Sequence, residues 1–458
     1  MKQDLTVIIL AAGQGTRMKS GKAKVLHEAG GDTLLNHVIR QALTVTDPSR
    51  VVAVIGHQAG RVRESVIAPI RFAVQSERKG TGHAVLCARP FIDPASELLM
   101  ILNGDGPLIL PATLQALAGS VRIGNNAAVV TTELDDPAGY GRIVRNEHGG
   151  IAAIVEDAAA SPEIQRIREI NAGAYCFRPA LWDYLNEIQP CNPAGEYYIT
   201  DVVGLMTRHG DSVTPLLVKD STELLGINTL VELAVADGIL RQRKAQELML
   251  SGVTIENPAS VTVDTGVTVA PDTVIESNVQ LRGATRIGAG CHIGTGSVLR
   301  NCVVEDDVRI LPYVVADQSH IEANVNVGPF SRLRPNARAC EGSHIGNFVE
   351  LKNTTLGAGS KANHLAYLGD SIIGSGVNIG AGSITCNYDG SKKQPTKIEN
   401  GVFVGSNSTL VAPLTIHEGA YIAAGSVITK EVAADALAIG RSRQSDKPGW
   451  AKRRRELK

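Results

Sequence analysis

The sequence predicts two different folds in series: an α/β domain with a mainly parallel sheet, then a linker helix and a solenoid of short parallel strands. Three observations predict them. An aliphatic run over residues 5–10 leads into a glycine-rich turn, and aliphatic runs then alternate with amphipathic stretches up to about residue 228. From residue 252 onward, aliphatic-glycine pairs recur every six residues, as at Ile287-Gly288 and Ile293-Gly294.

Length and composition limit the possible classes of protein. A chain of 458 residues favours two or three domains, and 43% hydrophobic with 20% charged residues is typical of a soluble globular protein. The formal net charge of -1 gives no field that would attract nucleic acid or an anionic membrane. Seven cysteines without a C-x-x-C pair indicate reduced thiols in the cytoplasm, and no apolar run approaches the ~18 residues of a membrane span.

The first part of the chain reads as a sheet with helices on both sides. Residues 51–55, 98–102 and 127–131 are continuous aliphatic runs, which predict strands buried on both faces. Residues 34–43 and 112–117 are amphipathic and predict helices between them. In such folds ligands collect at the carboxyl ends of the strands, where Gly13 and Asp105 both fall.

A helix is predicted between the two parts. Thr229 and Glu232 form the S/T-x-x-E pattern of a capping box ahead of an apolar helical pattern. We therefore expect an α/β domain over residues 1–228, a linker helix over 229–251 and a solenoid domain over 252–458.

Each six-residue step of the solenoid predicts one flat face of a coil, with three faces closing one turn. The phase holds for three steps from Val327 to Ile345 and has slipped by Ile373. The slip predicts an inserted loop that contains residues 361–367 and protrudes from the wall, where function would lie.

The glycine turn and its neighbours indicate an anion site. Gly13 and Gly15 allow a nest of backbone N–H groups, and Arg17 and Lys24 could offset phosphate charge, although a plain strand-to-helix turn with two exposed bases explains the pattern equally well. The amide of Gln75, ahead of a Gly-Thr-Gly turn at 80–82, suits the reading of a base edge. Asp105 follows a strand, where it could hold Mg²⁺ or only form a turn.

The motifs at residues 10–18, 24–27, 75–83, 104–108 and 195–201 are similar to those of the sugar-1-phosphate nucleotidyltransferases. The whole chain resembles the bacterial bifunctional N-acetylglucosamine-1-phosphate uridyltransferase/glucosamine-1-phosphate acetyltransferase family. The resemblance implies a Rossmann-like nucleotidyltransferase domain followed by a left-handed parallel β-helix. It also implies acetyl-CoA-dependent acetylation of glucosamine-1-phosphate, then Mg²⁺-dependent uridylyl transfer from UTP, which supplies peptidoglycan and lipopolysaccharide precursors.

The resemblance also assigns residues in the first domain. It places Lys24 at a phosphate with Arg17 nearby, and Mg²⁺ at Asp105 and Asn228. The remaining expected contacts with UTP or the sugar nucleotide are Leu10, Ala11, Ala12, Gly13, Gln75, Gly80, Thr81, Asn103, Gly104, Gly141, Glu156 and Asn171. The family usually has proline at Ala23, tyrosine at Asn103 and Val or Thr at Gly106, and we expect the loss of that proline to loosen the segment before Lys24.

In the solenoid, His364 lies among polar and small residues, which suits a general base for acetyl transfer from a thioester to an amine. Periodicity alone favours a scaffold. The resemblance implies that His364 is the base and that the remaining contacts with glucosamine-1-phosphate and acetyl-CoA are Arg334, Lys352, Tyr367, Asn378, Ala381, Asn387, Tyr388, Lys393, Ser406, Ala424 and Arg441. Position 366 is Ala where the family usually has Ser or Thr.

Two other functions remain open from the sequence. The coil could be regulatory, as in glucose-1-phosphate adenylyltransferases, or both domains could form a non-catalytic assembly protein, as in some translation-factor subunits. The His364 segment argues against the first, and the joint presence of Arg17, Lys24, Asp105 and Asn228 argues against the second. The resemblance further implies a homotrimer with acetyl-transfer sites between subunits, small-molecule substrates, and no nucleic-acid or membrane partner.

Overall fold

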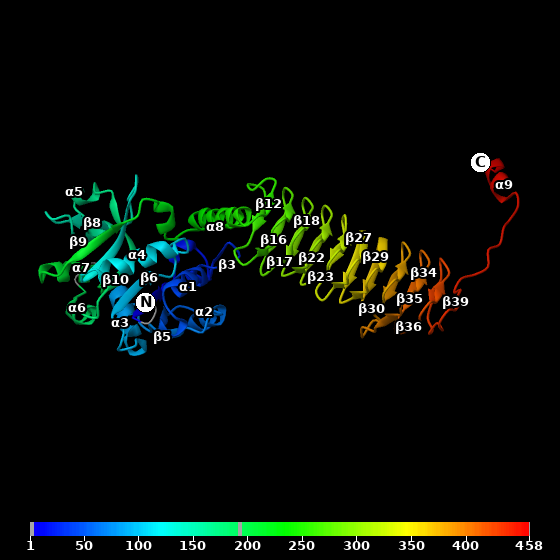
Figure 1. Cartoon of the computed structure of the whole chain (residues 1–458), viewed down its shortest axis with the longest axis horizontal. Helices are drawn as coiled ribbons and strands as arrows, with labels where there is room; N and C mark the ends of the chain where they lie inside the picture. The colour runs from blue at the N-terminus through cyan, green and yellow to red at the C-terminus, as the bar shows by residue number, and fades with distance from the viewer. Residues whose placement is uncertain (1–3, 191–194, 458) are drawn as a thin grey trace. The chain divides into compact units, whose positions relative to one another are not determined.

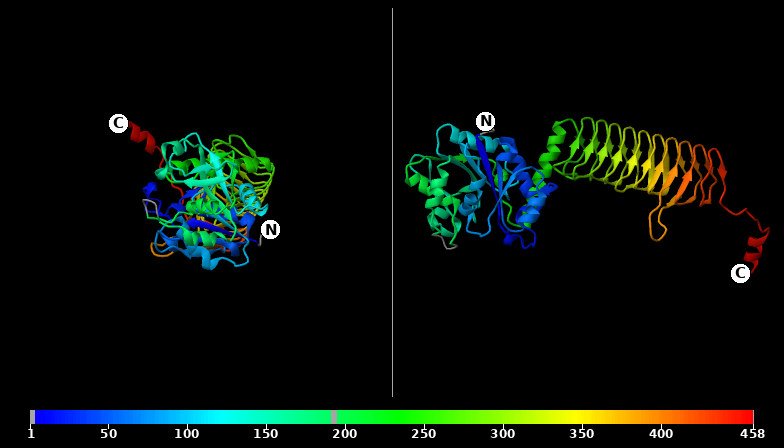
Figure 2. Two further views of the ribbon diagram at one scale, coloured as in Figure 1. Left: turned by 90° about the vertical axis from the view of Figure 1, so that its left-hand side faces the viewer. Right: turned by 90° about the horizontal axis from the view of Figure 1, so that it is seen from below.

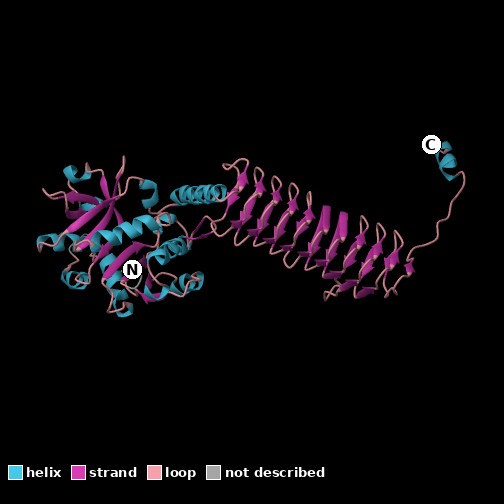
Figure 3. Cartoon of the chain, in the orientation of Figure 1, coloured by secondary structure: helices cyan, strands magenta, loops and turns pink. Residues whose placement is uncertain are grey.

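The computed structural model describes residues 4–190 and 195–457, and it confirms the predicted fold class. By their internal contacts the described residues form two compact units, residues 1–240 and 241–458 (Figure 1). Helices and strands alternate in the first unit, whereas the second consists mainly of short strands (Figure 3).

A mixed sheet forms the centre of the first unit. Its strands are β1 (Leu5–Ala11), β4 (Val51–Ile55), β5 (Arg71–Val74), β6 (Leu98–Asn103), β7 (Ala127–Glu133), β8 (Arg142–Arg145), β9 (Ile151–Val155), β10 (Glu169–Phe177) and β11 (Val213–Leu217). The order across the sheet is β11-β7-β10-β6-β1-β4-β5, and β8 and β9 form a hairpin against β10. On the main path β10 runs antiparallel to its neighbours, whereas β1 is parallel to both β4 and β6. The sheet is therefore mainly parallel, as predicted.

Helices cover both faces of this sheet. The helices of the chain are α1 (Leu34–Val45), α2 (Ala59–Ser65), α3 (Thr81–Ala88), α4 (Pro111–Arg122), α5 (Pro162–Gln165), α6 (Leu181–Glu187), α7 (Ile199–Arg208), α8 (Leu230–Leu250) and α9 (Trp450–Glu456). Apolar residues of α1, α2 and α4 pack on one face, and those of α3, α6 and α7 pack on the other. All five residues of β4 are fully buried, which confirms the prediction of a strand covered on both sides.

The predicted capping box begins helix α8. The Thr229 hydroxyl accepts a hydrogen bond from the Glu232 N–H at 3.2 Å, and the Glu232 carboxylate accepts one from the Thr229 N–H at 2.7 Å. Two backbone donors that the first turn would leave unpaired are thereby satisfied. The same carboxylate accepts the N–H of Asn228 at 2.6 Å, so the cap also fixes the residue before the helix.

The second unit is a stack of coils with three walls. Two walls form one continuous set of parallel strands: β12 (Thr254–Ile255), β13 (Thr262–Val263), β15 (Val274–Ile275), β16 (Gln280–Arg282), β18 (His292–Ile293), β19 (Val298–Arg300), β21 (Arg309–Ile310), β22 (Val315–Asp317), β24 (Asn326–Val327), β25 (Arg332–Leu333), β27 (His344–Lys352), β29 (Lys361–Gly369), β31 (Asn378–Ile379), β32 (Ile384–Cys386), β34 (Phe403–Val404), β35 (Thr409–Val411), β37 (Tyr421–Ile422), β38 (Val427–Ile428) and β39 (Leu437–Ala438). The third wall contains β14 (Thr268–Val269), β17 (Arg286–Ile287), β20 (Val303–Val304), β23 (His320–Ile321), β26 (Arg338–Ala339), β28 (Thr355–Leu356), β30 (Ser371–Ile373), β33 (Thr396–Ile398) and β36 (Leu414–Ile416).

Each coil repeats the previous one in register. Asn326 pairs with His344, 18 positions on, and His344 pairs with Lys361, 17 positions on. The aliphatic residue of each short strand points inward and forms one continuous core. Buried hydroxyls add hydrogen bonds between coils; for example, Ser331 and Ser360 donate to carbonyls of the next coil at 2.6 Å. The stack therefore satisfies its interior polar groups as it buries its aliphatic ones.

The prediction of an inserted loop that contains residues 361–367 is wrong. Residues 361–369 form strand β29, which pairs along its length with β27. The phase slips because some coils have 17 residues instead of 18. The insertion lies later: Ser371 pairs with Thr396, 25 positions on, and between them a hairpin closed by the Tyr388–Lys393 bridge protrudes from the wall. Figure 2 shows this hairpin in orange, extending away from the stack.

Close stacking makes one glycine of this unit sensitive to substitution. A Cβ added at the buried Gly346 would lie 1.9 Å from the carbonyl oxygen of Asn363 in the next coil. We expect Gly346→Ala to lower the free energy of unfolding of this unit by about 2 kcal/mol or more, because the backbone must shift. Calorimetry would show this as a lower melting temperature for residues 241–458.

Gly238 provides the matched control. It lies within α8, and a Cβ there meets nothing within 4 Å. Gly238→Ala should stabilise the helix by about 0.5–1 kcal/mol. Equal melting temperatures for the two variants would contradict the close stacking at Gly346.

Candidate active sites

The carboxyl ends of β1 and β6 border a cleft, which we call the strand-end cleft. One part of it, of about 230 Å³, is lined by Leu10, Ala11, Gly13, Gly15, Thr16, Arg17, Lys24, Val25, Asp105 and Asn228. A second part, of about 400 Å³, is lined by Arg17, Lys24, Thr81, Asn103, Asp105, Gly106, Gly139, Tyr140, Gly141, Glu156, Asn171, Ala172, Gly173, Tyr175, Ile199, Thr200, Leu224, Gly226 and Asn228. Twelve of the residues that the sequence singled out in this domain therefore share one cleft, whereas Ala12, Gln75, Gly80 and Gly104 are outside its lining.

Two cations and two oxygen-bearing side chains meet at the centre of the strand-end cleft. The Lys24 ammonium forms an ion pair with the Asp105 carboxylate and donates to the Asn228 amide oxygen at 2.7 Å. The Arg17 guanidinium donates to the same oxygen at 2.7 Å. Lys24 and Asp105 are 13% and 22% exposed, so solvent screens their attraction only in part.

Local structure explains how Lys24, Asp105 and Asn228, which are far apart in the sequence, meet at the centre of the cleft. Lys24 begins a short 3-10 helix, Asp105 follows β6, and Asn228 is fixed by the cap of α8. Gly15 has φ +71°, and a Cβ there would lie 2.5 Å from the Lys24 Cβ. Only glycine lets the turn approach the lysine this closely, and this is the specific role of the predicted glycine turn.

One end of the cleft is rich in hydrogen-bonding groups. Glu156 accepts from the Thr200 hydroxyl at 3.0 Å, and Asn171 donates to the Tyr175 hydroxyl at 2.7 Å while its N–H bonds Gly141. Burial raises the pKa of Glu156, and the Thr200 hydrogen bond offsets this only in part. Sequence reasoning found Gly141, Glu156 and Asn171 but missed Thr200, although it lies inside the quoted 195–201 motif.

The Gly-Thr-Gly turn at 80–82 is held by that same motif. The N–H of Gly82 donates to the Tyr197 carbonyl at 2.8 Å, and the Ile199 N–H donates to the Thr81 hydroxyl at 3.0 Å. The buried Gln75 amide donates to the Gly80 carbonyl at 3.0 Å. Gln75, Gly80 and Thr81 are therefore brought together on the side of the cleft that Thr81 lines, and their contact with a nucleotide stays a prediction.

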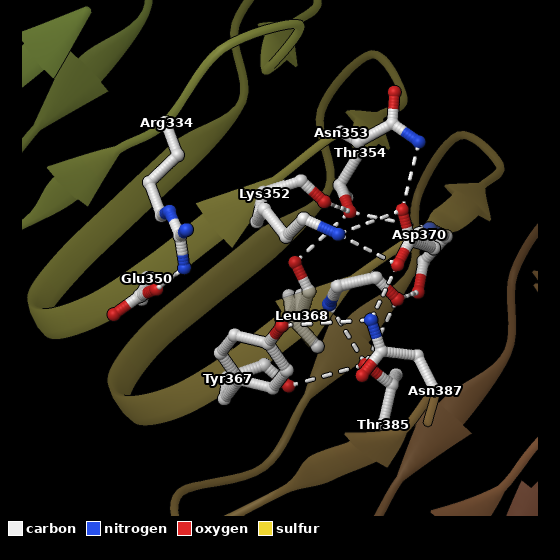
Figure 4. Close-up of polar contacts among 12 residues, drawn as sticks. Arg334, Glu350, Lys352, Asn353, Thr354, Tyr367, Leu368, Asp370, Thr385 and Asn387 are labelled. Atoms are coloured by element: carbon white, nitrogen blue, oxygen red, sulfur yellow. Dashed lines mark hydrogen bonds and ion pairs between the residues drawn. The ribbon is translucent and has the colours of Figure 1, made fainter. Parts of the chain in front are cut away.

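A second set of candidate side chains lies on the solenoid, and we call it the lysine cluster: Lys352, Tyr367, Asp370 and Asn387. The Lys352 ammonium donates to both Asp370 carboxylate oxygens at 2.9 and 3.1 Å. The Asn387 amide donates to Asp370 at 2.5 Å and to the Tyr367 hydroxyl at 3.5 Å. Figure 4 shows Lys352 and Asn387 pointing toward Asp370 from different coils.

Arg334 and Lys393 border the lysine cluster. Arg334 lies on the coil before that of Lys352, and it pairs at 3.0 Å with Glu350, which is on the same strand as Lys352 (Figure 4). Lys393 belongs to the protruding hairpin, and the nearby Lys352 ammonium lowers the pKa of Lys393. The structure thus places Arg334, Lys352, Tyr367, Asn387 and Lys393 near one another, and it adds Asp370 and Glu350, which sequence reasoning missed. The binding role that the resemblance implies for the first five stays a prediction.

His364 lies on the same strand as Tyr367, on the other side of a corner. It is exposed, and its Nδ1 is 3.0 Å from the Asn347 amide oxygen. That contact is satisfied when Nδ1 carries the proton, which leaves Nε2 as the unprotonated nitrogen. The arrangement suits a general base that faces solvent, and Asn347 is the orienting partner that the sequence did not reveal.

The other residues predicted to contact acetyl-CoA follow the coil register. Ile379, Val404 and Ile422 pair in succession, so Ala381, Ser406 and Ala424, each two positions later, occupy the same place in consecutive coils. Asn378 begins β31, Tyr388 lies in the hairpin, and Arg441 has its side chain beside Gly425. Their role in binding stays a prediction.

Within residues 4–190 and 195–457, His, Cys, Asp and Glu form no group of three or more that could hold a metal ion. Across the same ranges, none of the helices is long and apolar enough to cross a membrane. The cysteines Cys87, Cys176, Cys291, Cys302, Cys340 and Cys386 are free, and Cys191 lies outside the described residues.

Comparisons with known proteins cover the whole chain. A family model described as a MobA-like NTP transferase domain matches residues 7–188, and one described as a bacterial transferase hexapeptide (six repeats) matches residues 395–430. The chain is 50% identical to the bifunctional protein GlmU of Solibacter usitatus, over 100% of this chain and 99% of that protein. It is 48% identical to GlmU of Koribacter versatilis (98% and 97% covered) and 44% identical to GlmU of Streptococcus thermophilus (97% and 96% covered).

The raised pKa of Glu156 generates a prediction about stability. A carboxyl group that binds its proton more tightly in the folded state makes the protein less stable as pH rises from the usual glutamate range to the raised value. Glu156→Gln should therefore increase the melting temperature at pH 8, and the gain should vanish at pH 4. Melting temperatures of both proteins across this range, without substrate, would test it. A gain of equal size at pH 4 and pH 8 would contradict the assignment.

Proposed function

This chain belongs to the GlmU family of bifunctional proteins, and we propose that its first unit carries uridylyl transfer and its second unit acetyl transfer. The protein is a bifunctional enzyme of UDP-N-acetylglucosamine synthesis. It acetylates glucosamine-1-phosphate with acetyl-CoA and then couples N-acetylglucosamine-1-phosphate to UTP, which releases pyrophosphate. The observation that supports the first assignment best is the meeting of Arg17, Lys24, Asp105 and Asn228 at the strand ends.

Uridylyl transfer needs positioning and charge neutralisation more than covalent help. A phosphate oxygen of the sugar attacks the α-phosphorus of UTP, and the bond to pyrophosphate breaks. Lys24 and Arg17 would face the phosphates, and the turn at 10–13 with Gln75, Gly80 and Thr81 would hold the uridine. Asn103, Gly104, Gly141, Glu156 and Asn171 would hold the sugar nucleotide. A cleft with these groups already oriented lowers the barrier by preorganisation.

The donors at the centre of the strand-end cleft fit Mg²⁺. The Asp105 carboxylate and the Asn228 amide oxygen both contact one cation, the Lys24 ammonium, so these oxygens already converge on a positive charge. Mg²⁺ is usually bound through one or two carboxylates together with substrate phosphates, which agrees with so small a protein donor set. We infer that Asp105 and Asn228 hold it, and when bound it would neutralise charge on the phosphates.

Acetyl transfer would use the lysine cluster and His364. The sugar amine attacks the thioester carbonyl carbon, its proton passes to Nε2 of His364, and the carbon–sulfur bond breaks to release CoA. Asn347 would keep Nδ1 of His364 protonated. Arg334, Lys352, Tyr367, Asn378, Asn387 and Lys393 would bind the sugar phosphate, and Ala381, Tyr388, Ser406, Ala424 and Arg441 would line the acetyl-CoA groove.

An exposed apolar column supports a homotrimer. Tyr313, Phe330 and Phe348 stack at one corner of consecutive coils with centroids 5.2 and 5.6 Å apart, and each ring is about half exposed. Leu365, 63% exposed, has the same left-handed backbone conformation at the next coil. Bulky side chains in this conformation cost about 1–2 kcal/mol each, and burial against another copy of the chain would offset that cost. Since Leu365 follows His364, the acetyl-transfer site would then lie at a subunit boundary. Location in the cytoplasm stays a prediction from the sequence.

Removal of Asp105 tests the first assignment. Asp105→Ala should reduce uridylyl transfer at least 100-fold, because the proposed metal loses its carboxylate and Lys24 loses its counter-ion. Pyrophosphate release from UTP and N-acetylglucosamine-1-phosphate measures the effect. Acetyl transfer by the same preparation is the control and should stay within twofold. Loss of both activities in a folded protein would refute independent sites.

Removal of His364 tests the second assignment. The unchanged protein should release CoA from acetyl-CoA when glucosamine-1-phosphate is present and UTP is not, above a sugar-free control for reaction at its own cysteines. His364→Ala should reduce this release 100-fold or more and leave uridylyl transfer intact. Absence of sugar-dependent release from the unchanged protein would leave the solenoid as a scaffold. Normal release from His364→Ala would exclude His364 as the base.

A further inference from the structure

A largely buried carboxylate lies at the centre of the lysine cluster. Asp370 is 14% exposed and Lys352 is 15% exposed. The two oxygens of Asp370 accept hydrogen bonds from Lys352, from Asn353 at 2.8 Å and from Asn387 at 2.5 Å. Donors from the coils on either side of Asp370 therefore converge on one carboxylate.

The backbone fixes where Asp370 lies. Its φ of +49° turns the chain at the end of β29, and its N–H donates to the Lys352 carbonyl at 2.9 Å. The preceding Gly369 allows close approach, since a Cβ there would lie 2.5 Å from the Tyr367 hydroxyl and 2.7 Å from the Asn387 amide nitrogen. The main chain thus fixes the backbone of Asp370 relative to Tyr367 and Asn387, and the hydrogen bonds from Lys352, Asn353 and Asn387 hold the carboxylate.

A purely structural ion pair would not require this arrangement. Along the third wall, Glu322 is 16% exposed, but its partner Arg338, at 2.6 Å, is 55% exposed, and a pair whose cation faces solvent contributes little. Taking Asp370 and Lys352 out of water costs several kcal/mol unless every oxygen and proton finds a partner. Both of the partners that Asp370 holds in the interior, Lys352 and Asn387, are groups proposed to bind the sugar phosphate.

We propose that Asp370 is a positioning residue for the acetyl-transfer site: it fixes the Lys352 ammonium and the Asn387 amide at the spacing that one sugar phosphate requires. The inference rests on the proposed acetyl transfer and adds a residue to it. Asp370 acts through Lys352 and Asn387 and need not touch the substrate.

Charge explains why an acid is needed at this point. Lys352 faces Asp370, Tyr367 and the second ammonium of Lys393, and Arg334 also lies near Lys393. The hydrogen bonds that Lys352 donates to Asp370 raise the pKa of Lys352, whereas Lys352 lowers the pKa of Lys393. For Asp370 itself, burial would raise the pKa, but the bonds from Lys352, Asn353 and Asn387 outweigh it and lower the pKa. Asp370 thus keeps Lys352 charged beside another cation, so both can face one phosphate.

The test removes the negative charge of Asp370 and keeps the shape of its side chain. Asp370→Asn should raise the KM for glucosamine-1-phosphate about 10-fold or more, with a smaller fall in kcat and an unchanged KM for acetyl-CoA. The alkaline limb of the kcat/KM profile for the sugar should move to lower pH, because Lys352 loses the group that raises its pKa. Glu322→Gln removes an ion pair from the third wall and is the matched control; its KM values and pH profile should equal those of the unchanged protein.

A double-mutant cycle shows whether Asp370 acts through Lys352. Calorimetric Kd values for glucosamine-1-phosphate are compared for Asp370→Asn, Lys352→Met and the double variant. We expect Asp370→Asn to weaken binding less than twofold when Lys352 is already absent. Multiplicative effects would overturn the positioning role, as would a KM and pH profile for Asp370→Asn that match the unchanged protein.

If Asp370→Asn lowers the melting temperature too far for kinetic measurements, a substitution at Asn353 provides a second test. Asn353 is exposed, donates to Asp370, and has a φ of +48°, which glycine accepts without strain. Asn353→Gly should raise the sugar KM two- to threefold and leave kcat unchanged; an unchanged KM would overturn the proposal. If the unchanged protein binds glucosamine-1-phosphate but releases no CoA, acetyl transfer fails while the binding cycle still tests Asp370. If it does neither, both proposals fall.

Discussion

The register between coils is the constraint on which the second unit depends. Because each strand that begins between residues 262 and 361 pairs with the strand 17 or 18 positions later, residues at that spacing become neighbours regardless of their side chains. Lys352, Asp370 and Asn387 are separated by 18 and 17 positions, so the register alone brings them to one corner. A slip of one residue would exchange inward and outward side chains along each strand and would dissolve both core and cluster. The aliphatic core and the buried hydroxyl bonds hold that register in place.

In the first unit, residues that are distant in sequence are brought together by the sheet and a helix cap instead of by a coil register. Lys24, Asp105 and Asn228 are far apart in sequence, and they meet because β1 and β6 are parallel neighbours that end at the same edge of the sheet. Asn228 is brought in by the capping box, in which Glu232 accepts the N–H groups of both Asn228 and Thr229. The Glu232 carboxylate therefore stabilises the first turn of α8 and also holds Asn228, a proposed metal ligand, in place at the cleft.

Sequence reasoning reached the fold and most of the first cleft, because hydrophobic period, glycine turns and the capping box are local signals. The solenoid insertion is the one element it places wrongly. Counting in steps of six treats a 17-residue coil as a break and so predicts a loop at residues 361–367, whereas the insertion is the hairpin after Asn387. The sequence does not single out Asp370, because an aspartate at a solenoid corner is most simply a turn residue. Asp adopts the left-handed backbone conformation of such turns readily. Its partners are set by neighbouring coils, which a linear pattern does not reveal.

Both candidate sites pair a lysine with a carboxylate, and the consequences differ between them. In each, a lysine that is proposed to meet a phosphate is already paired with an oxygen of the protein: Lys24 with Asp105, and Lys352 with Asp370. A lysine held this way has lost most of its rotamer freedom before substrate arrives, so less entropy is lost on binding. At Lys24 the partner is itself the proposed metal ligand, so with Asp105 holding Mg²⁺ the Lys24 ammonium would turn from the carboxylate toward the phosphates. At Lys352 there is no incoming cation of that kind to replace the lysine, and Asn353 and Asn387 keep Asp370 in place. The first pair is therefore built to exchange partners and the second to persist, which is why charge removal at Asp370 should act on sugar binding and not on the metal-dependent step.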